Sequence, residues 1–285
     1  MMREVKIEAD RCSSCGQCVE VCTKGVLEML DGESTPHVTP EGVCSVCGHC
    51  VAVCPNNAIS HEGMNAMDIR PVGAVHVAPE DMRMFLASKR SVRRFADRPV
   101  ERRVLEELID LARLAPSAKN QQDRGFIVVT DREIIRAMDR AVVAAFAKLL
   151  RVLSKPVRKV LGATLPVVRH LDRNAKSLHG LIERSRAGQF PVFHDAPCVV
   201  LGYGAAANPL SRDNCVIAQQ YLSLYAQSMG LASCVIGYAT SRPKALKPFV
   251  EVPAGQAIQT ATIFGYPDVT FARTVARDAA KVSWY

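Results

Sequence analysis

The sequence predicts an α+β protein built from two units, and three observations support this prediction. Residues 1–63 contain a cysteine-rich run that occurs twice, as expected of a pseudo-symmetric module. Residues 80–285 alternate between apolar residues at helical spacing and short β-rich runs, which indicates helices packed on a sheet. Residues 64–79 hold Pro71, Gly73 and Pro79 without a clear period, so we expect a linker there.

The cysteines of the first unit form two runs with the spacing C-x2-C-x2-C-x3-C, beginning at Cys12 and at Cys44. Three thiolates at this spacing can point into one loop and hold one face of a cubane cluster. The fourth cysteine lies too far along the chain and ligates the other cluster. The spacing therefore predicts two 4Fe–4S clusters. The ligands of the first are Cys12, Cys15, Cys18 and Cys54, and those of the second are Cys44, Cys47, Cys50 and Cys22.

Two other uses of these cysteines are less favoured. Paired C-x2-C motifs also bind zinc, but a zinc site needs four ligands and no third cysteine at this spacing. Disulfides need an oxidising compartment, and the N-terminus lacks an apolar signal region. The unit resembles the bacterial two-cluster ferredoxin. One departure is Thr23, which follows Cys22 where Pro55 follows Cys54, so the turn after Cys22 is less rigid.

Composition limits what the whole chain can be. Eight of the 11 cysteines are assigned to clusters, which leaves Cys198, Cys215 and Cys234. Cys234 is either a buried core thiol, the more frequent case, or a redox thiol. No apolar run reaches the length of a membrane span, so we expect a cytoplasmic protein that does not bind a membrane.

The net charge of +8 is unevenly distributed. Residues 1–63 hold 4 Lys and Arg against 9 Asp and Glu, whereas residues 132–186 hold 13 against 4. Apolar residues at helical spacing accompany the basic ones and no nucleic-acid motif does, so a solvated helical face is favoured and nucleic-acid binding is not. The other alternative is docking of an acidic partner, either an external ferredoxin or the chain's own cluster module.

The elements expected in each unit follow from the apolar patterns. In the first unit we expect strands at 5–8 and 58–60 and a hairpin-like loop at 30–42. In the second we expect helices at 80–89, 101–115, 131–153 and 213–229, and strands at 126–129, 198–201 and 257–264. Residues 154–193 are basic, weakly periodic and interrupted by Pro156, Pro166 and Pro191, so we expect an insertion or lid.

A second chemical site is suggested by the run Lys89-Arg90-Ser91-Val92-Arg93. Guanidinium forks form bidentate bonds with a phosphate monoester, and a serine hydroxyl adds a short one. By itself this run is weak evidence for a phosphate site, because basic residues beside a helix end usually lie on the surface.

The motifs that follow this run resemble those of the FMN-dependent nitroreductase family. They are R-S-x-R-x-F at 90–95, P-S-x-x-N-x-Q at 116–122, G-L-x-S-C-x-x-G at 230–237 and G-Y-P at 265–267. The resemblance covers about residue 80 to the C-terminus, and the whole chain looks like the members that carry an N-terminal ferredoxin module. It implies a nitroreductase-type α/β/α sandwich with a mixed, mainly antiparallel sheet. The domains are then a ferredoxin domain at 1–63, a linker at 64–79 and an FMN domain at 80–285.

The resemblance also implies the residues that bind FMN. Arg90, Ser91 and Arg93, with help from Lys89, are expected to hold the phosphate and the pyrimidine edge of the ring. The backbone at Ile236 and Gly237 is expected to approach the reactive flavin N5. The further candidates are Pro116, Ser117, Asn120, Gln122 and Arg277, with Arg273 as a second choice for the last. No catalytic side chain is implied, and one departure, Asp123-Arg124, alters the pocket wall.

The function expected from this resemblance is that of a cytoplasmic flavoprotein oxidoreductase, homodimeric, with FMN at the subunit interface. Two iron–sulfur clusters would exchange single electrons with FMN, which would reduce a small organic acceptor such as a nitro or quinone-like compound. The first alternative is an electron-transfer adaptor between ferredoxin and a partner protein, without a substrate of its own. The second is a regulatory module that binds nucleic acid through the basic stripe. His170, His179 and His194 lack a partner motif and are expected on the surface, although one could be an acid near substrate.

Overall fold

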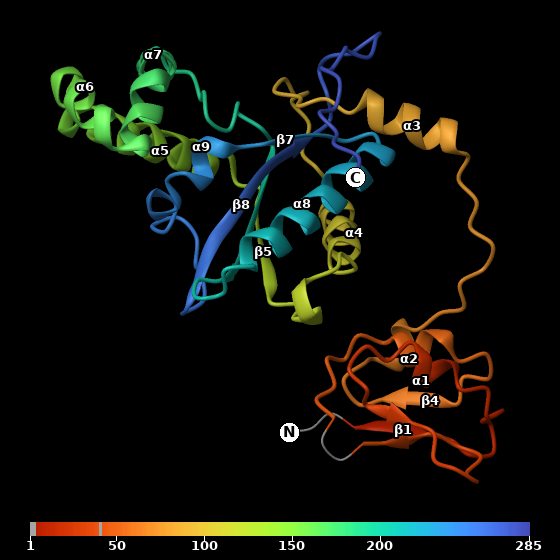
Figure 1. Cartoon of the computed structure of the whole chain (residues 1–285). Helices are drawn as coiled ribbons and strands as arrows, with labels where there is room; N and C mark the ends of the chain where they lie inside the picture. The colour runs from red at the N-terminus through yellow and green to blue at the C-terminus, as the bar shows by residue number, and fades with distance from the viewer. Residues whose placement is uncertain (1–3, 40–41) are drawn as a thin grey trace. The chain divides into compact units, whose positions relative to one another are not determined.

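The computed structural model describes residues 4–39 and 42–285, and contacts divide the chain into two units (Figure 1). Unit 1 comprises Met1–Val77 with Ala118–Gln121, and unit 2 comprises Ala78–Ser117 with Gln122–Tyr285. The predicted domain limits at 63 and 80 stay predictions. Residues 40 and 41 of the predicted hairpin loop, and the first three residues, lie outside the described part of the chain.

In its described residues, unit 1 contains two small antiparallel pairs and two short helices. The strand β1 (Val5–Ile7) pairs with β4 (Ile59–His61), and β2 (Leu27–Glu28) pairs with β3 (His37–Val38). The helices are α1 (Gln17–Glu20) and α2 (His49–Val53), and a 3-10 turn, η1 (Ala66–Asp68), follows β4. The predicted strands are thus confirmed.

The two short helices begin in the same way. Each follows a glycine in the left-handed region, Gly16 at φ 72° and Gly48 at φ 78°, where an L side chain would be strained. Each glycine directly follows the second cysteine of its run, and the third cysteine lies in the first turn of the helix. The repeat in the sequence is therefore a repeat in the backbone as well.

Unit 2 is built on a four-stranded sheet in the order β5-β6-β8-β7. Its strands are β5 (Arg124–Val129), β6 (Cys198–Ala205), β7 (Ala232–Val235) and β8 (Gln256–Gly265). All three pairings are antiparallel, and a parallel bridge joins Ser91 to Ser233 beside β7. The strand β7 was not expected from the sequence.

Helices cover both faces of this sheet, because β6 is apolar on both sides. Cys198 and Val200 pack with α4 (Arg102–Ala112) and α8 (Ser211–Ser228). Val199 and Leu201 belong to the larger core that includes α5 (Arg132–Val152) and α7 (Pro166–Arg186). Figure 1 shows α4 and α8 on one side of the sheet and α5, α7 and α9 (Gly237–Thr240) on the other. The α/β/α architecture expected from the sequence is confirmed.

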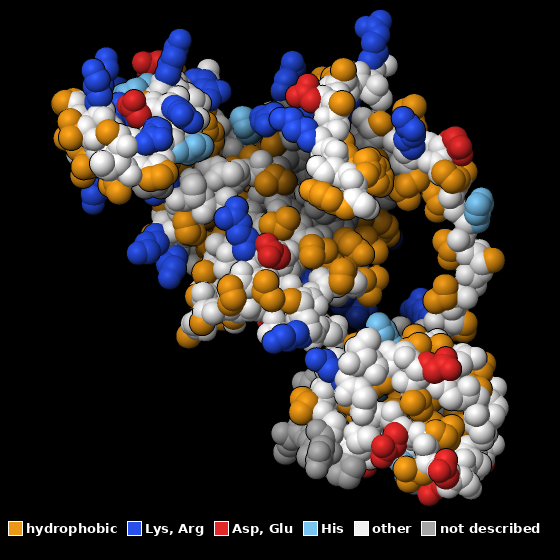
Figure 2. Space-filling view, in the orientation of Figure 1, with side chains coloured by type: hydrophobic (Ala, Val, Ile, Leu, Met, Phe, Trp, Pro, Cys, Tyr) orange, Lys and Arg blue, Asp and Glu red, His pale blue; other side chains and the backbone are white. Residues whose placement is uncertain are grey.

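The segment 154–193 is more regular than expected. It forms α6 (Lys155–Thr164) and α7, and Pro156 and Pro166 lie in the first turns of these helices. Proline is tolerated there because the first N–H groups of a helix have no intrahelical partner. The prolines therefore start helices where the sequence had suggested interruptions. Figure 2 shows Lys and Arg side chains gathered over α6 and α7.

The remaining elements are α3 (Pro79–Ser88) and η3 (Pro243–Ala245) in unit 2, and η2 (Ala118–Asn120) in the segment that groups with unit 1. Asp131 caps α5 as expected, accepting hydrogen bonds from the backbone N–H groups of Glu133 and Ile134. Across the described ranges, no helix combines the length and the apolar composition that crossing a membrane requires.

Candidate functional site

Two cavities in unit 1 are each lined by four cysteines. The first is lined by Cys12, Cys15, Cys18 and Cys54, and the second by Cys22, Cys44, Cys47 and Cys50. The thiols are spread around each cavity: in the described residues, no three His, Cys, Asp or Glu side chains meet closely enough to hold a single metal ion. The last cysteine of each run thus lies with the first three of the other run.

Backbone N–H groups point at several of these sulfurs. The N–H of Val26 donates to the sulfur of Cys22 at 3.2 Å, and the N–H of Ala58 donates to the sulfur of Cys54 at 3.2 Å. These two bonds are equivalent in the repeat. Burial raises the pKa of Cys22, but the surrounding backbone N–H groups outweigh it and bring that pKa below the usual thiol value. At Cys50, burial and the neighbouring thiolates raise the pKa to about 11. Four cysteine sulfurs around one cavity, with backbone N–H groups directed at several of them, fit a 4Fe–4S cluster.

The second cysteine cavity also contains a histidine that sequence reasoning missed. The N–H of Gly63 donates to Nδ1 of His61 at 2.8 Å, so the neutral ring carries its proton on Nε2. That Nε2 lies 3.3 Å from the sulfur of Cys44 and donates to it. His61 is 5% exposed, and nothing in the sequence around it signals this contact.

In unit 2, residues from three distant segments line one pocket of about 260 Å³. Of the predicted FMN-binding residues, the structure brings together Arg93, Ile236 and Gly237 there. The pocket also includes Val192, His194, Val235 and Tyr238, which were not predicted as site residues.

The run 89–93 is attached to the segment 230–237 through one serine. Nζ of Lys89 donates to Oγ of Ser233 at 2.9 Å, and Ser91 forms the bridge with Ser233. Burial lowers the pKa of Lys89. Two motifs far apart in the sequence therefore meet at the edge strand β7.

Arg90 has unsatisfied hydrogen-bonding capacity. Its Nη1 donates to the carbonyl oxygens of Ala87 at 2.9 Å and of Lys89 at 2.6 Å. Its Nε and Nη2 are buried and have no hydrogen-bond partner in the protein. Leaving charged N–H groups buried and unpaired is costly, so a bound anion such as a phosphate fits this position.

The other predicted FMN-binding residues do not line this pocket. Oγ of Ser117, next to Pro116, accepts the backbone N–H of Gln122 at 2.9 Å. Asn120 belongs to the segment that groups with unit 1, and Arg277 lies in the exposed tail, as does Arg273. The roles of these residues stay predictions.

Asp123 and Arg124, which depart from the family pattern, have structural partners. The carboxylate of Asp123 accepts from Nδ2 of Asn208 at 2.8 Å and of Asn214 at 2.9 Å. Nη2 of Arg124 donates to the carbonyl oxygens of Arg113 and Ala115 beyond the end of α4. The pair therefore anchors the start of β5 to its neighbours.

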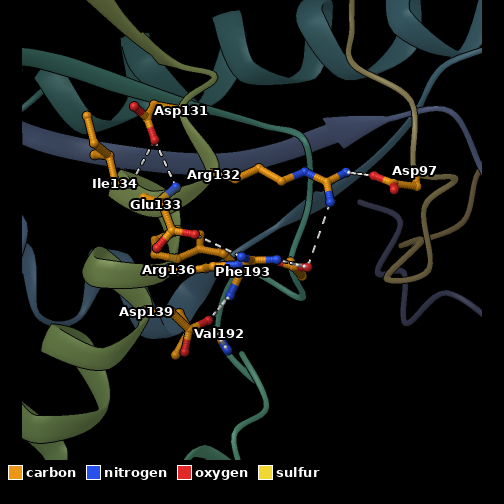
Figure 3. A network of polar contacts seen from close by, with 10 residues as sticks. Asp97, Asp131, Arg132, Glu133, Ile134, Arg136, Asp139, Val192 and Phe193 are labelled. Carbon is orange, nitrogen blue, oxygen red and sulfur yellow. Dashed lines mark hydrogen bonds and ion pairs between the residues drawn. The ribbon is translucent and has the colours of Figure 1, made fainter.

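A buried polar network holds the wall of the pocket that contains His194 (Figure 3). Oδ2 of Asp139 accepts the backbone N–H groups of Val192 at 2.9 Å and Phe193 at 2.7 Å, and Asp139 is fully buried. Arg136 binds Asp195 with two bonds of 2.8 and 3.0 Å. His194 and Asp195 adopt left-handed φ angles of 55° and 50°, a conformation that these contacts hold in place.

Burial shifts the pKa values of Asp139 and His194. Burial raises the pKa of Asp139 to about 6, against the two N–H groups that lower it. Burial, with Arg93 and Arg184, lowers the pKa of His194 to about 4. His194 is therefore a neutral imidazole at physiological pH that faces the pocket, and not the surface residue that the sequence suggested.

Two family models match this chain. The model of the nitroreductase family matches residues 86–266, more than half of the chain. The chain belongs to the nitroreductase family. The model of the 4Fe-4S dicluster domain matches residues 11–59, so this family member carries an iron–sulfur domain in front.

Known proteins agree with this assignment. The chain is 29% identical over 189 residues to an NADH dehydrogenase of Thermus thermophilus, which covers 66% of this chain and 87% of that protein. A stretch of 51 residues is 43% identical to the 4-nitrobenzoate reductase of Pseudomonas putida, covering 18% of this chain and 22% of that protein. The structure of a nitroreductase with bound FMN from Bacteroides fragilis matches the fold with a TM-score of 0.55 at 18% identity, covering 71% and 98%. The chain is thus a nitroreductase-like oxidoreductase with a 4Fe–4S ferredoxin-type domain.

Proposed function

We propose that this protein is an FMN-dependent oxidoreductase in which single electrons pass between two 4Fe–4S clusters and FMN, and a small organic acceptor is reduced. When bound, the clusters supply one-electron transfer and FMN supplies the exchange of two electrons with the acceptor. The observation that carries the proposal is the pair of four-cysteine cavities in the same chain as a nitroreductase domain.

The residues of unit 1 would act as ligands. Cys12, Cys15, Cys18 and Cys54 would hold one cluster, and Cys22, Cys44, Cys47 and Cys50 the other. The N–H groups that point at Cys22 and Cys54 would stabilise the negative charge of the ligand sulfurs. His61 would do the same for Cys44.

The residues of unit 2 would bind and orient FMN. Arg90 offers two buried N–H groups to an anionic oxygen, and Ser91 and Lys89 lie beside it in the same run. Arg93 would face negative charge that develops on the reduced ring system. The backbone of Ile236 and Gly237 lines the same pocket without a bulky side chain at Gly237, which leaves room for close approach. The cofactor roles of Pro116, Ser117, Asn120, Gln122 and Arg277 remain part of the proposal.

An enzyme is favoured over an adaptor because unit 2 has room for a substrate. A cavity of about 590 Å³ adjoins the smaller pocket, and the two share Gly237 and Tyr238. A protein that only passes electrons to a partner needs no such space. A nitro compound suits the reaction, as the name of the Pseudomonas relative suggests.

A homodimer is part of the proposal. Val216, Ile217 and Tyr221 on α8 are each exposed by 38 to 39%. A second copy that covers this face would remove apolar surface from water. Ferredoxin or another redox protein is the expected electron partner of unit 1.

The deciding experiment is anaerobic titration of the purified protein with reduced ferredoxin and, separately, with NADPH, while flavin and cluster absorbance are followed. We expect ferredoxin to reduce the clusters and then the flavin. A variant with Cys47→Ala and Cys15→Ala should lose flavin reduction by ferredoxin. Flavin reduction by ferredoxin at an unchanged rate in this variant would show that the clusters are not the route.

A further inference from the structure

A large cavity of unit 2 lies between α5, α7 and the turn that follows α9, elements that Figure 1 shows next to one another. Its volume is about 590 Å³, and the cavity is partly open to solvent. Its walls are mostly aliphatic and aromatic, with Leu149 from α5 and Leu171 from α7 among them. This volume and lining suit a small organic molecule with an apolar body.

One end of this cavity is aromatic and positively charged. The rings of Phe146 and Tyr238 meet edge to face with centroids 5.6 Å apart, and Oη of Tyr238 is tied to Oγ of Ser177 at 3.0 Å. The guanidinium of Arg242 lies over the ring of Phe146, 5.0 Å from its centroid. Arg242 is therefore held on a rigid aromatic wall.

Arg242 has capacity for an anion. Its Nε is buried and has no hydrogen-bond partner in the protein. Among the described residues that line the cavity, it is the one with a permanent charge. A guanidinium with one buried, unpaired N–H in a mostly apolar cavity favours a ligand with one anionic group.

The cavity also reaches the pocket proposed for FMN. Gly237 and Tyr238 line both, and Gly237 is a residue whose backbone is expected to approach the reactive part of the flavin. A molecule in the cavity would thus extend from Arg242 toward that pocket.

We propose that this cavity binds the organic acceptor, and that the acceptor has an apolar, partly aromatic body and one anionic group that pairs with Arg242. The inference rests on the proposed function in that the occupant is taken to be the electron acceptor of the same protein. It assigns α7, which the sequence suggested to be an insertion or lid, to the wall of the acceptor site.

The test measures binding without turnover. Isothermal titration calorimetry on the FMN- and cluster-loaded protein would use naphthalene-2-carboxylate and its uncharged analogue naphthalene-2-carboxamide, neither of which carries a nitro or quinone group. We expect the acid to bind at least about 10-fold more tightly than the amide, because a charge-assisted hydrogen bond is lost with the amide.

The variant Arg242→Met keeps an apolar side chain of similar length and should remove this preference, weakening the acid about 10-fold or more and leaving the amide within about 2-fold. Arg242→Lys should restore part of it. Leu171→Trp should weaken both ligands by filling the cavity. Arg151→Met, an exposed change on α5 outside the cavity, is the matched control and should change nothing.

Equal binding of acid and amide, no binding of either, or an unchanged preference in Arg242→Met would overturn the inference. Retained cluster and flavin absorbance identifies variants that are folded. The ferredoxin titration of the same samples separates the two proposals. If the acid binds in an Arg242-dependent way but ferredoxin does not reduce the flavin, the proposed function alone is wrong. If ferredoxin reduces the flavin but the acid does not bind in this way, the inference alone is wrong.

Discussion

The cysteine cavities of unit 1 and the Arg93 pocket of unit 2 are built in opposite ways. Each cysteine cavity takes three of its donors from seven consecutive residues, held by a left-handed glycine and one turn of helix. The Arg93 pocket takes its lining from the segments around 93, 192–194 and 235–238, which only the sheet and the buried Asp139 network bring together.

This difference predicts how each site fails. In unit 1 the binding energy comes from a few ligand bonds, so loss of one donor should empty one site and spare the other. In unit 2 the binding energy is spread over hydrogen bonds and backbone contacts, so single changes should weaken binding by degrees.

The largest effect is expected from single cysteine variants. Cys15→Ala and Cys47→Ala should each reduce the iron content from about eight to about four atoms per chain, since each cluster holds about four. Because the fourth ligands are exchanged between the runs, Cys54→Ala should leave the same spectrum as Cys15→Ala, and Cys22→Ala the same as Cys47→Ala. Iron analysis and electron paramagnetic resonance measure both. Cys234→Ala, a buried thiol of unit 2, is the control, and the opposite pairing of spectra would show that each run holds its own cluster.

A smaller effect is expected at Arg90. The change Arg90→Met removes the two buried N–H groups that fit an anion and should weaken FMN binding roughly 10- to 100-fold. Flavin release measured by fluorescence gives the affinity, and the cluster absorbance should not change. Arg94→Met, which removes an exposed ion pair with Asp268, should leave FMN affinity within about 2-fold. Equal affinities in the two variants would remove Arg90 from the site.

Asp139 should control the stability of the pocket wall. The change Asp139→Ala leaves the N–H groups of Val192 and Phe193 without an acceptor and should lower the free energy of unfolding by about 2 kcal/mol or more. Asp139→Asn keeps an oxygen acceptor and should cost less. Urea unfolding of the two variants and the wild type measures the difference, and equal stabilities would show that these bonds contribute nothing.

The same residue sets a pH dependence with a defined sign. Because burial raises the pKa of Asp139 from 3.8 to about 6, the folded protein binds a proton that the unfolded chain has lost between these values. The contribution of Asp139 to stability should therefore fall as pH rises through this window, and Asp139→Asn should abolish that fall. His194, whose pKa is lowered, makes the free energy of unfolding change with pH in the opposite direction. The quantity to compare is therefore the difference in free energy of unfolding between Asp139→Asn and the wild type, measured from pH 5 to pH 7. An unchanged difference across this range would contradict the raised pKa.

The smallest effect is expected from His61, which makes the two cysteine cavities unequal. It donates to Cys44, whereas the repeat places Met29, without a donor, at the equivalent position of the first half. Loss of one hydrogen bond of about 1 kcal/mol in His61→Leu should lower the midpoint potential of the Cys44 cluster by roughly 40 mV. His61→Gln, which keeps an N–H, should lower it less, and Met29→Leu should leave both potentials unchanged. Redox titration followed by electron paramagnetic resonance measures the midpoint potentials of both clusters. If neither potential shifts in His61→Leu, the hydrogen bond from His61 to Cys44 does not tune the cluster.

What the sequence could predict follows the same division. The cysteine sets were accessible because sulfur ligands at fixed spacing depend only on local backbone geometry. The helix after Asp131 and the strands at 126, 198 and 257 were accessible because their patterns are long or strongly apolar. The helices α6 and α7 were missed because Pro156 and Pro166 suggested breaks where they start helices.

The residues of the pocket wall illustrate what the sequence did not reveal. Asp139 falls on the buried stripe of α5 with Ile135, Met138 and Val142, and an acid on an apolar stripe was a visible sign of a buried partner. His194 and His61 gave no comparable sign, because their roles depend on segments distant in the sequence.

The exchange of the last cysteine between the two runs has a consequence for how the protein matures. Neither half of unit 1 can surround a cubane cluster with four sulfurs from its own run. If the chain were cut between the two runs, each piece would therefore offer only three ligands to a cluster. A cluster in one cavity links Cys22 or Cys54 to the three cysteines of the opposite run. The two runs are then held together, so the fourth ligand of the other cavity lies closer to its three partners. Filling of one cavity should therefore assist filling of the other, while a chain that lacks one ligand can still fill the cavity whose four cysteines are intact. The two copies of the duplicated run therefore depend on each other, because neither copy alone supplies four ligands to one cluster.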